Sequence, residues 1–229
     1  MAGNIVRTID DWVRPQNVLM SVSDKRDLQV IVNGLVSIND KLRIFSTGGT
    51  FEAVQKILGP EAAKRHLVQV SDYTGQPETQ GGLVKTLDFK IYLGLLTETY
   101  NEAHRGDLVR TQAVAIDVVV VNLYPFQQTV QKQGVTVEEA RANIDIGGPC
   151  MLRAAAKNYL RVAPICDPSD YGPLTGKLRA AGGRLDLRSR FQLAKKAFAH
   201  TAEYDAAIAR YLAEQPDQAV ECCYEKKGA

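Results

Sequence analysis

The stretch NIDIGGPCMLRAAAKN, residues 143–158, joins an acidic, glycine-containing loop to a run of strong helix formers. Pro149 follows two glycines, and its fixed φ angle and missing N–H suit the first turn of a helix. Residues 151–156 all favour the helical state. We therefore predict a loop that presents Asp145, followed by a helix that begins near Pro149.

Two cations, Arg153 and Lys157, lie one turn apart on the same face of this predicted helix. Like charges at that spacing repel each other, and no acidic residue within the helix offsets them. Two interpretations stay open. Either the pair meets an anion, from elsewhere in the chain or from a ligand, or it is a solvated helix face.

The composition is that of a soluble globular protein. The chain has 229 residues, of which 45% are hydrophobic and 24% charged, enough for one large α/β domain or two small ones. A net charge of +2 without a long basic run argues against nucleic acid as a partner. No apolar run is long enough to predict a membrane span, and the N-terminus lacks a signal-peptide core.

The four cysteines, Cys150, Cys166, Cys222 and Cys223, form no C-x-x-C pair, and only three histidines accompany them. A structural zinc site is therefore not expected, and a reducing cytoplasm is the simplest compartment. Cys150 lies near the start of the predicted helix, where a thiolate is favoured. Because no histidine is near it in sequence, we interpret it as a packing residue rather than a catalytic thiol.

Apolar runs and amphipathic segments alternate along the chain, which predicts an α/β fold with a mostly parallel central sheet flanked by helices. We expect one domain over 17–212, a lead-in over 1–16 with a short helix near 9–13, and a polar, frayed tail over 213–229. Strands are predicted at 17–22, 42–45, 67–70, 116–123 and 161–166, a surface loop at 71–82, and helices at 28–36, 51–58, 98–105, 134–143, 168–180 and 187–212. Ser23 or Asp24 is the expected N-cap of the first of these helices, and Thr136 that of the fourth.

Two turns rich in Gly, Ser and Thr follow predicted strands: SVSDK at 21–25 and STGGT at 46–50. In open parallel sheets, ligands bind at the carboxyl ends of strands, where free N–H groups at helix starts attract phosphate. STGGT is neither a P-loop nor a dinucleotide fingerprint. Each turn is therefore a phosphate-binding loop or a plain tight turn, and their repetition on successive strands favours phosphate.

The motifs together resemble the IMP cyclohydrolase half of the bifunctional purine-biosynthesis enzyme, whose fold is similar to that of methylglyoxal synthase. Matching pieces occur in the family's order from about residue 17 to 212: SVSDK, STGGT, SDYTG at 71–75, VKTL at 84–87, VVVNLYPF at 119–126, GVTVEEA at 134–140, residues 143–158, and KAFAHTAEYDAAIARYL at 196–212. VNLYPF and IDIGG…LRAAAKN are the distinctive ones.

This resemblance implies closure of the purine ring of a formylated aminoimidazole carboxamide ribotide to IMP, with loss of water and without a metal or cofactor. The matching catalytic positions are Lys85, Tyr124, Asp145 and Lys157. Substrate contacts would come from Ser23, Lys25, Ser46, Gly48, Thr50 and Thr86, and from the backbone at Asn122, Ile146, Gly147 and Gly148.

Each role has a chemical reason. A carboxamide nitrogen must lose a proton as it attacks, and Asp145 can accept it. Lys157 or Tyr124 can donate a proton to the departing oxygen. N–H groups at Gly147 and Gly148 can stabilise an oxyanion. Lys85 can orient Tyr124 or polarise the substrate. The alternative is that Lys85, between apolar neighbours, is simply the outward-facing residue of an alternating strand.

The chain departs from the family pattern at 81–94, where Leu83 replaces an arginine and Asp88 and Tyr92 replace histidines. The resemblance does not extend to the transformylase half of the enzyme, so we expect a separate transformylase to supply the formylated nucleotide. A nucleotide-sensing module of the same fold is the alternative function. The Asp and His pattern of methylglyoxal synthase itself is not found. A homodimer through the long C-terminal helix is a further expectation.

Overall fold

The fold is built on one five-stranded sheet. The structure, a computed structural model, describes residues 5–77 and 84–228. Its strands are β2 (Asn17–Val22), β3 (Arg43–Ser46), β4 (Leu67–Gln69), β5 (Val118–Asn122) and β6 (Ala163–Ile165). They pair in the order β4-β3-β2-β5-β6, and every pair is parallel. The predicted fold class is confirmed.

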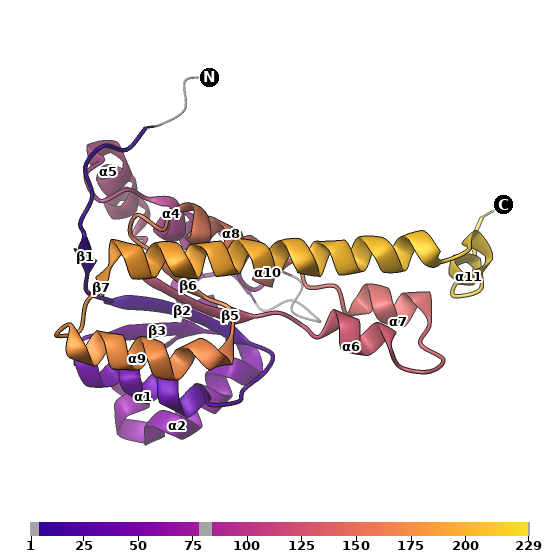
Figure 1. Cartoon of the computed structure of the whole chain (residues 1–229), viewed down its shortest axis with the longest axis horizontal. Coiled ribbons are helices and arrows are strands. Elements are labelled where there is room, and N and C mark those ends of the chain that lie inside the picture. The colour runs from indigo at the N-terminus through magenta and orange to yellow at the C-terminus, as the bar shows by residue number, and fades with distance from the viewer. Residues whose placement is uncertain (1–4, 78–83, 229) are drawn as a thin grey trace.

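Helices cover both faces of the sheet, so alternate residues of each central strand enter different apolar clusters. Leu19 and Val119 pack on one side, under α4 (Phe89–Leu96), α8 (Gly147–Lys157) and α10 (Leu187–Glu214). Val18 and Met20 pack on the other, under α1 (Leu28–Ile38), α2 (Gly48–His66) and α9 (Tyr171–Ala180). Figure 1 shows these three layers. The apolar run of β5 is explained by this double cover.

The order of the strands creates a crevice beside β2. From β2 the chain moves outward to β3 and β4, and then returns to the other side of β2 for β5 and β6. The connections that leave β2 and β5 therefore diverge at the carboxyl ends of these two strands. Ligands in open α/β sheets bind at such a switch point.

The predicted helix near 9–13 is wrong. Instead β1 (Trp12–Val13) pairs antiparallel with β7 (Leu185–Asp186). The fully buried guanidinium of Arg190 holds this corner by donating to five carbonyl oxygens. These belong to Asp10, Asp11, Tyr159, Leu160 and Leu185.

Shorter helices complete the chain: α3 (Val70–Thr74), α5 (Glu102–Thr111), α6 (Phe126–Val130), α7 (Val137–Ala142), the 3₁₀ turn η2 (Pro168–Asp170) and α11 (Asp217–Glu221). α3 lies where a loop was predicted. Thr136 is the N-cap of α7, as predicted, and it forms a reciprocal capping box with Glu139. The N-cap of α1 is Asp27, not Ser23 or Asp24, because the chain needs a further turn before the helix begins.

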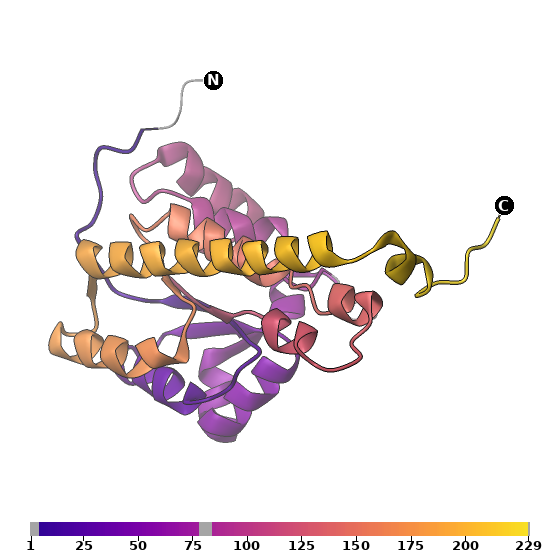
Figure 2. The same ribbon diagram turned by 45° about the vertical axis from the view of Figure 1, so that its right-hand side comes forward.

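The long helix α10 runs across the sheet and extends past it, and its distal half lies beside α6 (Figure 2). Beyond it, α11 contacts α7, and Tyr224 donates its hydroxyl proton to the Glu138 carboxylate. The predicted frayed tail is therefore folded in part. No helix among the described residues has both the length and the apolar character needed to span a membrane.

Candidate functional site

A cavity of about 440 Å³ opens at the crevice, between the first turns of two helices. Helix α2 starts at Gly48 after β3, and α8 starts at Gly147. The turn at residues 84–86 forms a wall between them. The structure brings twelve of the fourteen predicted site residues to this cavity: Ser23, Lys25, Gly48, Thr50, Lys85, Thr86, Asn122, Tyr124, Asp145, Ile146, Gly147 and Gly148.

The α2 end of the cavity is built for an anion. A methyl group added to Gly48 would lie 3.2 Å from Lys85 Nζ, and one added to Gly49 would lie 3.9 Å from Lys25 Nζ. Gly48 also has a φ of +48°, a backbone angle that residues with a side chain rarely adopt. Neither ammonium forms an ion pair with any residue that the structure describes. A phosphate here would therefore meet two ammonium groups and the free N–H groups of a helix start.

The loop that carries Ser23 and Lys25 is fixed by Asn122. The Asn122 side chain accepts from the Asp24 N–H and donates to the Asp24 carbonyl, both over 2.8 Å. This amide clamp joins the ends of β2 and β5, the two strands beside the crevice. The side chain of Asn122 therefore positions Lys25, a role that sequence analysis missed.

Asp145 lies at the other end, against the start of α8. Its Oδ1 accepts the Gly148 N–H over 2.8 Å, and the Tyr124 N–H also donates to the carboxylate. Burial raises the pKa of Asp145 above its usual value, and these two N–H groups oppose the rise only in part. A carboxylate with a raised pKa is a better proton acceptor than an exposed one.

Only part of the predicted oxyanion site is available. Because Gly148 donates its N–H to Asp145, it cannot also bind a substrate oxygen, and Pro149 has no N–H. The Gly147 N–H stays as a donor, and the Thr86 hydroxyl lies close to it. A methyl group on Gly147 would be 3.1 Å from Thr86 Oγ1.

Two predicted hydroxyl contacts are used within the protein. Ser46 is fully buried, donates to the Met20 carbonyl over 2.8 Å, and is not part of the cavity wall. The Thr50 hydroxyl donates to the Val22 carbonyl and accepts the Val22 N–H. Both side chains tie β3 and α2 to β2, so their hydroxyl protons are engaged within the protein, although Thr50 still lines the cavity.

Lys157 is not brought to the cavity. It lies in the last turn of α8, ten residues beyond Gly147, which corresponds to about 15 Å along the helix axis. Any action of Lys157 on a ligand in this cavity would require a second chain or a movement of α8. Its neighbour Arg153 stacks over the ring of Phe198 at 5.6 Å. The cationic face of α8 therefore points away from the site.

Tyr204, on α10, supports Asp145 from behind. Its hydroxyl accepts the Asp145 N–H over 2.8 Å and donates to the Asn143 carbonyl over 3.4 Å. Tyr204 belongs to the 196–212 motif of the resemblance. Its separation of 59 residues from Asp145 hid the contact from sequence analysis.

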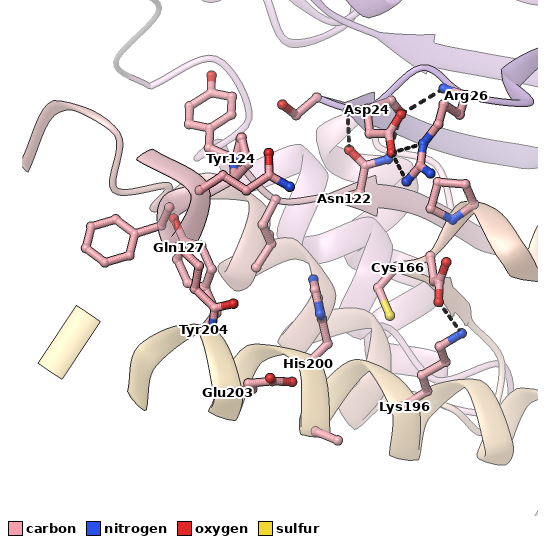
Figure 3. Close-up of a pocket in the computed structure, with 18 residues that line it drawn as sticks. Asp24, Arg26, Asn122, Tyr124, Gln127, Cys166, Lys196, His200, Glu203 and Tyr204 are labelled. Carbon is pink, nitrogen blue, oxygen red and sulfur yellow. Dashed lines mark hydrogen bonds and ion pairs between the residues drawn. The ribbon is translucent and has the colours of Figure 1, made fainter. Parts of the chain in front are cut away.

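A larger hollow of about 900 Å³ adjoins this cavity beyond Asn122 and Tyr124 (Figure 3). Its two cations are paired with carboxylates, and Glu203 adds a further negative charge. Arg26 binds Asp24 over 2.7 Å, and Lys196 reaches Asp167 over 2.7 Å and Asp170 over 2.8 Å. Burial raises the pKa of the Cys166 thiol to about 11, which keeps it protonated at neutral pH. The smaller cavity is therefore the better anion site.

Comparison with known proteins agrees with this geometry. Residues 28–150 match the family model of the MGS-like domain, and residues 155–228 match that of the AICARFT/IMPCHase bienzyme. A crystal structure of ForH superimposes with a TM-score of 0.70 at 31% identity, covering 85% of this chain and 97% of ForH. The chain therefore belongs to the family of proteins with an MGS-like domain.

Within that family, the relatives are named bifunctional purine biosynthesis protein PurH. The PurH of Ruminiclostridium cellulolyticum is 44% identical over 86% of this chain and 37% of its own length. That of Synechococcus sp. (strain CC9902) is 46% identical over 88% of this chain and 37% of its own length. The family resemblance is confirmed, and the chain spans little more than a third of these relatives.

Proposed function

We propose that this chain is an IMP cyclohydrolase that closes the six-membered purine ring of 5-formamidoimidazole-4-carboxamide ribotide with loss of water. The proposal rests on one observation: a cation-lined end and a carboxylate-bearing end face each other in the same cavity. An anion cradle of Lys25, Lys85 and the start of α2 faces a partly buried carboxylate, Asp145, at the start of α8. A ribotide offers a phosphate to the first and an ionisable N–H to the second.

The proposed reaction starts at the carboxamide nitrogen. Asp145 accepts its proton as the nitrogen attacks the formyl carbon and the new C–N bond forms. Negative charge then develops on the formyl oxygen, where the Gly147 N–H and the Thr86 hydroxyl can donate hydrogen bonds. Because both reacting groups belong to one molecule, holding them together supplies a large part of the acceleration.

The oxygen then leaves as water. It takes up one proton to become a hydroxyl group and a second as the C–O bond breaks, while the nitrogen that carried the formyl group loses its proton and a C=N double bond forms. We assign this proton exchange to the phenol of Tyr124, which lines the cavity and is 51% exposed. The formylated substrate would come from a transformylase, on another chain or further along the same polypeptide.

The sensing module is the rival function, and the substitutions at 81–94 are its main support. Two of them have structural roles here. Asp88 caps α4 by accepting the Lys90 N–H over 2.8 Å, and Tyr92 packs against the buried cluster under that helix. Leu83 lies outside the described residues. Asp88 and Tyr92 therefore have structural roles, and neither residue lines the cavity.

Turnover of the formylated ribotide to IMP, followed by absorbance, separates enzyme from sensor. We expect turnover by the wild-type chain and a KM at least about tenfold higher for Lys25→Ala, because a charge-assisted contact to phosphate is lost. Lys64→Ala, an exposed lysine in the last turn of α2, is the matched control and should change neither constant. Tight nucleotide binding without turnover by the wild-type chain would establish the sensor instead.

A methyl group at Gly148 should displace the Asp145 carboxylate and leave the phosphate end of the cavity unchanged. It would lie 2.4 Å from Asp145 Oδ2 and 2.7 Å from Leu123 Cδ2, so the carboxylate must move. We expect Gly148→Ala to lower kcat by about 10²-fold, the cost of a displacement near 1 Å. Gly106→Ala in α5 meets nothing within 4 Å and should keep full activity. Equal activity of the two variants would remove Asp145 from the mechanism.

A further inference from the structure

A second groove, of about 640 Å³, lies at the opposite end of the sheet from the cavity described above. It is enclosed by β1, β7, the end of α9 and the start of α10, beside the amino end of β2 (Figure 1). Its polar lining consists mainly of Lys177, Arg184, Arg188 and Asp186, and its aromatic wall is Trp12. None of these residues belongs to the proposed catalytic machinery.

The groove carries an excess of positive charge. Asp186 is its acidic residue, and that carboxylate is already used to cap α10 by accepting the Ser189 N–H over 3.0 Å. Within residues 5–77 and 84–228, Lys177 forms a side-chain hydrogen bond with the Ser189 hydroxyl alone, at 3.5 Å. Arg188 forms no ion pair with any of the residues described. Three cations therefore face the groove against one engaged carboxylate, which favours an anionic ligand.

Trp12 is held in place although it is exposed. It is the only tryptophan of the chain and keeps 45% of its surface open to solvent. Its strand pairs with β7 across Trp12 and Asp186, and buried Arg190 binds the carbonyls of the two preceding residues. Arg184 stacks over the indole at 5.5 Å. A fixed, partly open indole beside cations can stack a planar ring without a large ordering cost.

We propose that this groove binds a nucleotide, with its base against Trp12 and its phosphates between Lys177 and Arg188. The volume lies in the range of small-molecule sites. Base stacking on an aromatic side chain is tolerant of base identity, so the polyphosphate charge and the planar ring are the features recognised. The proposal stands independently of the cyclohydrolase reaction, because the two sites share no residue.

The single tryptophan makes binding directly visible. ATP is added to the Lys25→Ala variant, in which the other cavity is weakened, and Trp12 fluorescence is followed. We expect a saturable change whose Kd rises with salt concentration. Arg188→Ala should raise that Kd about tenfold or more, whereas Arg210→Ala, an exposed arginine on the same helix, should not.

The contribution of the ring is tested separately. Calorimetric titration of Trp12→Ala with ATP should show binding about tenfold weaker than wild type, and inorganic tripolyphosphate should bind both proteins equally. Three results would overturn the proposal: no fluorescence change up to millimolar ATP, the same Kd for Arg188→Ala and Arg210→Ala, or tripolyphosphate binding the wild-type chain as tightly as ATP.

Discussion

Asp145→Asn is expected to lower kcat for ring closure by about 10³-fold, within the range that a general base contributes. The amide has the shape of the carboxylate, and its oxygen can still accept the Gly148 N–H that Asp145 receives over 2.8 Å. It cannot take a proton from the substrate nitrogen. The loss should therefore appear in kcat, with KM little changed, when initial rates are measured over a range of ribotide concentrations.

The pH dependence of the wild-type rate should carry the same signature. A base acts only when deprotonated, so kcat falls as pH drops through the pKa of Asp145. Because burial raises that pKa, the acidic limb should lie above the range of an exposed aspartate. In Asp145→Asn the residual rate should lose this limb.

Stability supplies the control for the same variant. A carboxyl group whose pKa is raised by folding opposes folding at any pH above both pKa values. Asp145→Asn removes that burial cost, so its thermal midpoint at pH 7 should be no lower than that of the wild type. A variant that is stable and still turns over within threefold of the wild-type rate would show that another group is the base.

The sequence was a good guide to the sheet, because buried parallel strands are written as short β-branched runs. A β-branched run predicts the strand at 116–123, which contains β5, and a short apolar run predicts the strand at 17–22, which matches β2. Residues of the turns at 21–25 and 46–50 directly follow strands and lie at the cavity, whereas Lys85, Thr86 and Asp145 were assigned through the family resemblance. Local sequence predicts the position of a residue well where a strand leads directly into the turn that carries it.

Long-range hydrogen bonds were beyond sequence analysis. The Ser46 hydroxyl donates to the Met20 carbonyl, which is 26 residues away in sequence. The Tyr204 hydroxyl accepts the Asp145 N–H, which is 59 residues away. Lys157 lies away from the cavity for another reason. Membership of one motif suggested proximity to Asp145, but a straight helix separates its ends by its full length. The predicted helix at 9–13 failed because pairing with β7 and the Arg190 contacts override local preference.

Arg161→Leu should cost the fold about 3–5 kcal/mol, the usual result of removing one partner from a buried ion pair. Both side chains of the Arg161–Asp117 pair are about nine-tenths buried, and Nη1 and Oδ1 are 2.9 Å apart. The guanidinium also donates to the carbonyls of Gly94 and Ile116, joining α4 to β5. Leucine would leave these acceptors and a carboxylate buried. Thermal unfolding should show a midpoint lower by on the order of 10 °C.

The exposed pair of Arg110 and Asp107 on α5 is the matched control, and Arg110→Leu should leave the midpoint almost unchanged. The double variant Arg161→Leu/Asp117→Leu should be destabilised by less than the sum of the two single changes, because no charge is then left buried alone. It should still be less stable than the wild type. The Asp117 carboxylate also accepts the N–H groups of Gln16 and Asn17, which would lose their partner. Full additivity would mean that Arg161 acts through its carbonyl contacts alone, and that its charge is not what Asp117 requires.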